Sequence, residues 1–303
     1  MLESGKTILD KANKQKYAVG AFNVSNLEIL QAAVDAAAEL KSPIIIQTSE
    51  SAIKYAGMQN LVSLARNQAA AVKIPIALHL DHGKDMETIR NAISSGYTSV
   101  MIDASDEEFE KNIALTKKVA EIAHKKGVSV EGELGTLGGK EDYVSGKVQF
   151  TEPDSAKEFV EKTGIDCLAV AIGTSHGAYK FKSSQKLDIK RLEKIKKLVK
   201  MPLALHGASG VYKNAVHSAE KYGANLKGAK GNSDTEIRAA IKAGINKVNT
   251  DTDLRIAFTA ALRRQLHEHP EIFDPREILK PAKEGIKQMV IRRIRIFGSQ
   301  NKA

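Results

Sequence analysis

Short apolar segments alternate with amphipathic segments along nearly the whole chain, and this alternation constrains the fold more than any other feature. Each apolar segment is rich in β-branched residues and has the length of a buried strand. The expected strands are Tyr17–Phe22, Ile44–Thr48, Ile76–Leu80, Ser99–Ile102, Val128–Glu133, Cys167–Ile172, Leu203–Leu205 and Lys247–Asn249. Repeated strand–helix alternation predicts a parallel sheet, either open or closed into a barrel.

The segments between these strands have the 3.6-residue apolar spacing of helices that pack on a sheet. Several begin with Ser, Asn or Asp, whose side chains accept hydrogen bonds from the free N–H groups of a first helical turn. The expected helices are Asn26–Leu40, Met58–Val72, Asp85–Ser95, Asp106–Lys126, Asp154–Lys162, Asp188–Val199, Asp234–Ala243 and Asp253–His267, with one more around Pro281–Ile294. Length alone allows one barrel with additions or two domains, but no linker or repeat divides the chain.

Cysteine content and apolar runs bear on the cellular setting. The chain has one cysteine, Cys167, which excludes an internal disulfide and fits a reducing compartment. Its first residues are charged throughout and lack the apolar core of a signal peptide. Apolar runs such as Cys167–Ile172 are too short to span a bilayer. We therefore expect a cytoplasmic protein with no membrane partner.

The net charge of +10 is compatible with nucleic acid, an anionic surface or an anionic substrate as the partner. The densest basic cluster is Arg292–Arg295, and the other basic residues are mostly dispersed at helical spacing. Aromatic residues make up only 5% and Trp is absent, which argues against base stacking. A solvated surface together with a phosphorylated substrate explains the charge, and a basic nucleic-acid or surface-binding protein stays as a remote alternative.

Polar side chains follow almost every predicted strand at its C-terminal end, which is where α/β barrels carry their active sites. Three of them, His82, His176 and His206, come from different strands and predict a Zn²⁺ site with positions left open for substrate. His79 lies two residues before Asp81, so both side chains would point to the same face of the strand, into the barrel. We expect His79 to pack there or to support a metal ligand, and not to bind the metal itself. The rim residues are Asn23, Ser49, Asp81, His82, Asp103, Glu131, Glu133, His176, His206, Ser209, Asn249, Asp251 and Asp253.

Glycine-rich segments accompany two of these histidines. Residues Gly173–Gly177 and His206–Gly210 let the backbone approach a ligand, and their N–H groups can hold a phosphate. Residues Asn249–Asp253 stand just before a helix N-terminus, whose dipole also favours phosphate. The segment Gly135–Gly146 lacks apolar periodicity, contains an acid and predicts a mobile lid over the site.

Five short motifs in order resemble those of class II fructose-1,6-bisphosphate aldolases, the shorter class IIB form in particular. They are HLDHG at 79–83, EGELG at 131–135, GTSHGA at 173–178, LHGAS at 205–209 and VNTDTD at 248–253. The likeness extends from about Ala18 to residues 298–301 and so covers nearly the whole chain. It implies a single (β/α)8 TIM barrel over residues 1–303, with a C-terminal helical extension, in a lyase that works through a metal-stabilised enediolate.

The resemblance also implies a role for individual residues. His82, His176 and His206 would hold zinc, with Glu133 binding the metal in a buried resting position and Asp103 nearby. Asp81 would act as acid and base on the C4 oxygen, Glu141 would move the proton at C3, and Asn249 would contact the enediolate. The predicted phosphate and remaining substrate contacts are Gly177, Lys180, Gly207, Ser209, Asp251, Thr252, Asn23, Ser49 and Asp253.

The same resemblance implies partners for the chain. Arg255 is similar to a residue that reaches a neighbouring subunit's site to hold the second phosphate, which implies a homodimer or homotetramer. A monovalent cation, Na⁺ or K⁺, would lie beside the triose phosphate. Relatives that cleave tagatose 1,6-bisphosphate are the alternative in substrate. A Schiff-base aldolase is disfavoured because Lys247 starts its predicted strand, at the wrong end, and no other strand interior offers a lysine.

Overall fold

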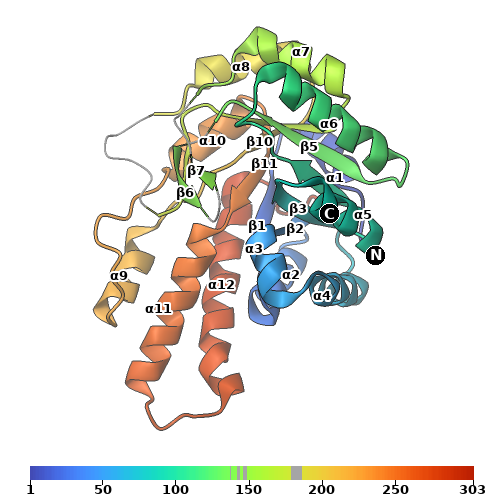
Figure 1. Cartoon of the computed structure of the whole chain (residues 1–303). Helices are drawn as coiled ribbons and strands as arrows, with labels where there is room; N and C mark the ends of the chain where they lie inside the picture. The colour runs from blue at the N-terminus through green and yellow to red at the C-terminus, as the bar shows by residue number, and fades with distance from the viewer. Residues whose placement is uncertain (137, 142–143, 146–148, 179–185) are drawn as a thin grey trace.

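A computed structural model of the chain shows eight parallel strands closed into a barrel, in the order β1-β11-β10-β8-β5-β4-β3-β2 (Figure 1). It describes residues 1–136, 138–141, 144–145, 149–178 and 186–303, with only the backbone of 138–141 and 144–145. The barrel strands are β1 (Val19–Asn23), β2 (Ile44–Ser49), β3 (Ile76–Gly83), β4 (Ser99–Ile102), β5 (Ser129–Leu134), β8 (Cys167–Val170), β10 (Leu203–Leu205) and β11 (Ile245–Thr250).

Every predicted strand is present, and the boundaries differ by a few residues at most. The first and last strands pair in parallel, with Val19 opposite Lys247, so the closed form of the sheet is confirmed and the open form is wrong. The longest extension is in β3, which continues through Asp81 and His82 to Gly83. Asp81 and His82, which the sequence analysis places after this strand, therefore lie within its last residues.

The predicted helices surround the barrel and share one large apolar core with the outer faces of the strands. Side chains cap several of them as expected, as where Asn26 accepts a hydrogen bond from the N–H of Ile29 and Asp85 from that of Thr88. These helices are α2 (Leu27–Glu39), α4 (Met58–Ala71), α5 (Met86–Ser95), α6 (Phe109–His124), α7 (Pro153–Thr163), α8 (Ile189–Val199), α10 (Asp234–Lys242) and α11 (Thr252–Glu268).

Three further helices are not among those predicted: α1 (Gly5–Gln15), α3 (Glu50–Ala56) and α9 (Lys213–Lys221). The first of them closes the N-terminal end of the barrel, because Ile8, Leu9 and Ala12 join a second core cluster that fills the barrel interior. Its apolar stripe has only a few residues among many charged ones, so the pattern is weak in the sequence. This plug leaves the opposite, C-terminal end of the barrel as the open one.

The C-terminal extension is a long helix, α12 (Pro275–Phe297), which starts earlier than predicted and continues through Pro281. It packs against α11 and α2. Figure 1 shows α11 and α12 lying side by side and projecting well beyond the barrel. The last turns of α12 are buried against the barrel, whereas its first turns lie on the projecting part.

A small sheet lies at the C-terminal rim, in the strand order β7-β6-β9. Its strands are β6 (Gly138–Glu141), β7 (Val144–Ser145) and β9 (Ser175–His176). Part of the predicted lid is therefore strand, and residues 137, 142–143 and 146 of it lie outside the described residues. Among the helices that the structure describes, none is long and apolar enough to cross a bilayer.

Candidate metal and substrate site

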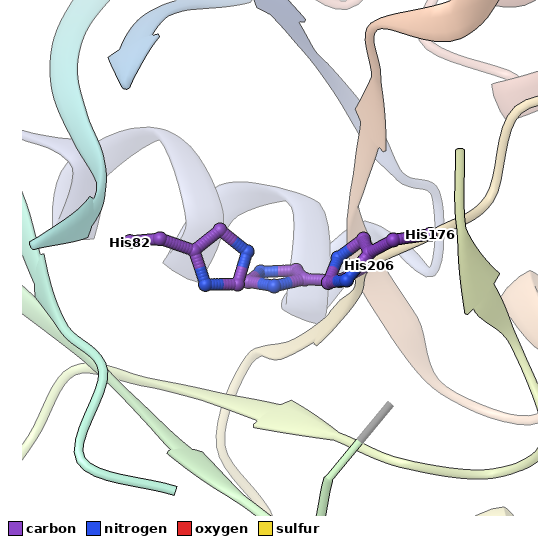
Figure 2. A group of neighbouring side chains, drawn as sticks. All are labelled: His82, His176 and His206. Carbon is purple, nitrogen blue, oxygen red and sulfur yellow. The ribbon is translucent and has the colours of Figure 1, made fainter. Parts of the chain in front are cut away.

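Three histidines converge at the C-terminal end of the barrel, as the sequence predicted (Figure 2). His82 comes from β3, His176 from β9, and His206 directly follows β10. The ring centroid of His82 lies 5.2 Å from that of His176 and 4.8 Å from that of His206. One nitrogen of each ring lies within 4.8 Å of the corresponding nitrogen of the others, a spacing that allows one metal ion to bind all three.

An irregularity in β3 lets two consecutive residues face the same rim. Neighbouring side chains of a regular strand point to opposite faces. Here the pairing with β4 shifts register between Leu80 and Gly83, and His82 has a φ of 49°. Such bulges redirect side chains and are common beside active sites. Both Asp81 and His82 therefore serve the site.

Hydrogen bonds to carboxylates indicate which nitrogen faces the metal position in His82 and in His206. The Nδ1 of His82 donates to Asp103 Oδ2 over 2.8 Å, which leaves its Nε2 free for a metal. His206 has the opposite arrangement: its Nε2 donates to Glu131 Oε1 over 2.7 Å. The Nδ1 of His206 is buried and has no hydrogen-bond partner among the described residues, so its lone pair is available.

Glu133 supplies a carboxylate oxygen to the same space. Its Oε2 lies 3.4 Å from His206 Nδ1 and 3.8 Å from His82 Nδ1, and it too is buried without a hydrogen-bond partner in the described part of the chain. Buried polar atoms are rarely left unpaired in folded proteins. An unpaired imidazole nitrogen and an unpaired carboxylate oxygen side by side fit a divalent cation with nitrogen and oxygen ligands.

Both carboxylate oxygens of Asp103 already have protein partners. Besides His82, its Oδ2 pairs with Lys84 Nζ at 3.0 Å, and its Oδ1 accepts from the Ser105 hydroxyl at 2.7 Å. Although burial opposes ionisation, the hydrogen bond and charge of His82 and the charge of Lys84 hold the pKa of Asp103 well below its ordinary value. These contacts favour a role in orienting His82, although Asp103 lies close enough to join His82 and Glu133 around an ion.

Asp81 is buried beside the histidines and held by three amide groups. Its Oδ2 accepts from Asn23 at 2.7 Å and from Gln47 at 3.2 Å, and its Oδ1 accepts from Asn249 at 3.1 Å. Burial opposes ionisation, but the charges of His82 and other nearby groups hold the pKa of Asp81 below its ordinary value. Sequence analysis missed Gln47; a glutamine directly after three isoleucines in a predicted strand was the available signal.

A cavity of about 250 Å³ is lined by Asn23, one of the amide partners of Asp81. It brings Asn23, Ser49 and Asp251, at three strand ends, together with Arg255 of α11. The Arg255 guanidinium pairs with Asp251 at 2.7 Å and lines this cavity within its own chain. The part of Arg255 in a neighbouring subunit's site stays a prediction.

The loop after β10 lies close against the segment that carries His176. Gly207 has a φ of 58°, and a Cβ there would lie 2.5 Å from the carbonyl oxygen of Ser175, so only glycine fits. Ser209 is buried in this loop, Gly177 has a φ of 80°, and Thr252 is the first residue of α11. The structure thus brings the predicted phosphate residues to the rim that carries the metal ligands.

Asp253 departs from its predicted role in binding substrate. Its side chain has no exposed surface. One carboxylate oxygen accepts from the N–H of Gly210 at 2.9 Å and the other from the N–H of Val211 at 2.7 Å. The contacts correct the prediction, because this carboxylate supports the loop after β10 instead of facing a substrate.

Lys247 also differs from expectation. It is the third residue of β11, not the first, and its side chain is fully buried inside the barrel next to Glu131. The prediction that Lys247 starts its strand was therefore wrong. His79 is confirmed as a packing and supporting residue, since its Nδ1 bonds Ser99 Oγ at 2.8 Å and its Nε2 lies 3.3 Å from Lys247 Nζ. Burial and the charge of Lys247 lower the pKa of His79 to about 3.

Two predicted residues are not placed by these contacts. The backbone of Glu141 belongs to β6, which pairs with the strand of His176, but its side chain is not among those described. Lys180 lies outside the described residues.

Three imidazoles and a carboxylate lie at the C-terminal rim of the closed barrel, next to a glycine loop suited to an anion. This arrangement is typical of (β/α)8-barrel enzymes that use a metal ion. The comparisons make the assignment specific. Residues 3–302 match the family model described as "Fructose-bisphosphate aldolase class-II". The chain belongs to the class II fructose-bisphosphate aldolase family and is an aldolase.

Relatives match over their full length or nearly so. A fructose-bisphosphate aldolase of Giardia intestinalis is 49% identical, covering 98% of this chain and 93% of that protein. One of Thermus caldophilus is 48% identical, with 100% of both chains covered. Among solved structures, the YdjI aldolase from Escherichia coli K12 is similar with a TM-score of 0.82 and 33% identity over 100% of both chains.

Proposed function

We propose that this chain is a zinc-dependent lyase that reversibly cleaves fructose 1,6-bisphosphate to dihydroxyacetone phosphate and glyceraldehyde 3-phosphate. The observation that carries the proposal is the convergence of His82, His176 and His206 beside the buried carboxylate of Asp81. A metal site with an adjacent ionised carboxylate has what is needed to break a carbon–carbon bond next to a carbonyl: a charge acceptor and a proton acceptor.

In this proposal the three histidines hold the ion, through Nε2 of His82 and Nδ1 of His206, with Glu133 within reach in a resting state. Zinc would supply positive charge that stabilises the negative charge developing on the dihydroxyacetone phosphate fragment. Asp103 and Glu131 would keep the two imidazoles in the required tautomers.

Proton movements fall to the carboxylates. Asp81, kept ionised by its surroundings, would take the proton from the C4 hydroxyl as the C3–C4 bond breaks and return it in the reverse direction. Asn23 and Asn249 donate hydrogen bonds to Asp81 and would orient it toward the substrate. Glu141 on the rim sheet is proposed to move the proton at C3 of the triose.

Two separate sets of residues are proposed to hold the two phosphates. Gly177, Gly207, Ser209, Asp251 and Thr252 would bind that of the triose, with help from Lys180 and a neighbouring Na⁺ or K⁺. The cavity lined by Asn23, Ser49 and Arg255 would take the other, since the Arg255 guanidinium supplies positive charge there. Holding both ends fixes the reacting centre with respect to the metal and Asp81.

The test is cleavage of fructose 1,6-bisphosphate by the purified protein, before and after EDTA and again after zinc is restored. We expect loss with the chelator, recovery with zinc and no inactivation by borohydride. Asp81→Asn should lose most activity while retaining zinc, with Asp35→Asn on the surface of α2 as the matched control. Full activity in EDTA combined with inactivation by borohydride would contradict the metal mechanism and direct attention to Lys247.

Tagatose 1,6-bisphosphate, which differs at one hydroxyl, is the second candidate substrate. The residues Asp251–Arg255 resemble the fructose enzymes and favour that epimer. Comparing kcat/KM for the two bisphosphates decides between them. No nucleic acid is needed for this function.

A homodimer or homotetramer in a reducing cytoplasm is also proposed. The projecting α11–α12 pair exposes Leu266 and Phe273, which are apolar side chains suited to a subunit contact. Light scattering of the purified protein tests the assembly.

A further inference from the structure

The loop from His206 to Val211 is held from outside through three consecutive carbonyl groups. Asn232 Nδ2 donates to the carbonyl of Gly207 over 2.9 Å, and the backbone N–H of Asn232 donates to that of Ser209 over 3.1 Å. Between them, Arg293 Nη2 donates to the carbonyl of Ala208 over 2.9 Å. Each carbonyl in the run thus has a donor that is not part of the loop.

These bonds determine where the loop's N–H groups point. In a trans peptide the C=O and the following N–H point in opposite directions. Turning the carbonyls of Gly207 and Ala208 outward therefore turns the N–H groups of Ala208 and Ser209 the other way, as in an anion-binding nest. The next two N–H groups, of Gly210 and Val211, are instead bound by Asp253.

The end of the loop is conformationally strained. Val211 has a φ of 47°, a conformation that is unfavourable for a β-branched residue. Such strain persists only where surrounding contacts hold it, and it is concentrated at functional sites. The bond from Val211 N–H to Asp253 is one such contact, and Asp253 in turn lies beside Arg293, with Nε 3.7 Å from its Oδ2.

Arg293 reaches this point from the buried end of α12. Its side chain has no exposed surface, its Nη1 donates to the Tyr212 hydroxyl over 3.0 Å, and its guanidinium lies over the Phe297 ring at 4.7 Å. A buried charge is costly unless it is paired and hydrogen-bonded. Being fully buried, it is not placed to touch a substrate. Its contacts instead join the loop after β10 to the first turn of α11, where Asp253 lies.

We propose that Arg293 is a positioning residue, which sets the loop from His206 to Val211 in the conformation that binds the phosphate of the triose. The planar guanidinium spans the Ala208 carbonyl, the Tyr212 hydroxyl and Asp253 together, which a lysine ammonium cannot do. The proposal rests on the phosphate role given above to this loop. On this proposal the C-terminal extension takes part in substrate binding indirectly, since Arg293 of α12 supports the loop without touching the substrate.

Arg293→Lys tests the proposal, because it keeps the buried charge and removes the planar fork. Arg295→Lys, on the exposed face of the same helix, is the matched control for replacing an arginine by a lysine. For each protein we would measure inhibition by inorganic phosphate, KM and kcat for fructose 1,6-bisphosphate, zinc affinity by chelator competition, and the thermal midpoint.

Arg293→Lys should weaken phosphate binding about tenfold and raise KM in parallel, the loss expected when a charged hydrogen-bond donor is misplaced. Zinc affinity should stay unchanged, because His206 is fixed independently by Glu131. The Arg295→Lys protein should behave as wild type. Unchanged phosphate binding in folded Arg293→Lys overturns the proposal, as does an equal loss of zinc and phosphate affinity, which would indicate a general loosening.

If Arg293→Lys does not fold, Tyr212→Phe decides, because it removes one partner of the guanidinium and leaves the charge in place. Weaker phosphate binding supports the positioning role, and unchanged binding overturns it. A wild-type protein that neither cleaves the bisphosphate nor binds phosphate would instead contradict the proposed function itself. The two failures are therefore distinguishable.

Discussion

The Nζ of Lys247 lies 2.8 Å from Oε2 of Glu131, and the two side chains are 0% and 2% exposed. This ion pair lies inside the barrel directly beneath the metal site, since the other oxygen of Glu131 accepts the hydrogen bond of His206. Burial by itself would raise the pKa of Glu131. The charge of Lys247 and the hydrogen bond from His206 outweigh burial and hold this pKa well below its ordinary value, so the carboxylate stays ionised. The barrel interior thus supports the imidazole that the site needs.

Glu131→Gln should lower zinc affinity by about 10- to 100-fold, the usual cost of removing a carboxylate that orients a histidine ligand. The neutral amide no longer enforces the tautomer in which His206 presents a bare Nδ1. Chelator competition measures the affinity, and Glu39→Gln on the surface of α2 is the control. An unchanged zinc dissociation constant would show that Glu131 does not orient His206.

Lys247→Met should reduce the free energy of unfolding by about 3–5 kcal/mol, because it leaves Glu131 buried and uncompensated. Lys287 pairs with Glu39 at 2.7 Å on the surface and gives a matched comparison. Lys287→Met should cost less than about 1 kcal/mol. Urea unfolding of the three proteins tests this, and equal losses for the two variants would contradict it.

His79 should make the stability of the metal-free protein depend on pH. Its pKa is lowered from 6.5 to about 3 in the folded state, so below pH 6.5 the unfolded chain binds a proton that the folded chain does not. The stabilising contribution is complete above pH 6.5 and is lost as the pH falls toward 3. At about 1.4 kcal/mol per pH unit, the loss between pH 7 and pH 5 is about 2 kcal/mol.

The measurement is urea unfolding in EDTA at both pH values, with His79→Gln for comparison. The decline in stability from pH 7 to pH 5 should be smaller in His79→Gln by about the amount given above. Equal declines in the two proteins would mean that the folded state binds the proton as readily as the unfolded state does.

Gly207→Ala should impair phosphate binding and activity, because the added methyl group has no room in the loop. The new Cβ would lie 2.5 Å from the Ser175 carbonyl, at a φ of 58°. Gly164 has a φ of 69° with nothing within 4 Å of its Cβ position, so Gly164→Ala carries the backbone strain alone. Inhibition by inorganic phosphate should weaken only in Gly207→Ala, and similar behaviour of the two variants would refute the steric argument.

Much of the fold could be predicted from the sequence because the signals are local. Apolar runs of a few residues predicted β2 and β4. The spacing of apolar residues and the capping residue Asn26 predicted the helix at Leu27–Glu39. The helix α1 was missed because its stripe is short, although three of its side chains close the barrel. Polar residues such as His206, placed just after an apolar strand, pointed to one rim because parallel strands end together.

Other features depended on how distant segments meet. Sequence analysis placed Asp81 and His82 together after their strand. Both in fact belong to β3, where consecutive side chains would point to opposite faces, and the register shift against β4 turns both toward the site. The sequence predicted a substrate contact for Asp253, whereas in the structure its carboxylate accepts hydrogen bonds from the loop after β10.

The sequence by itself determined the strand–helix order, the rim that carries the chemistry and the family. The tertiary structure alone decided that Lys247 enters the barrel and pairs with Glu131, and that Arg293 supports the loop after β10. The physical reason is that a sequence pattern reports which residues are buried within one element, whereas the partner of a buried charge is set by the register and closure of the sheet.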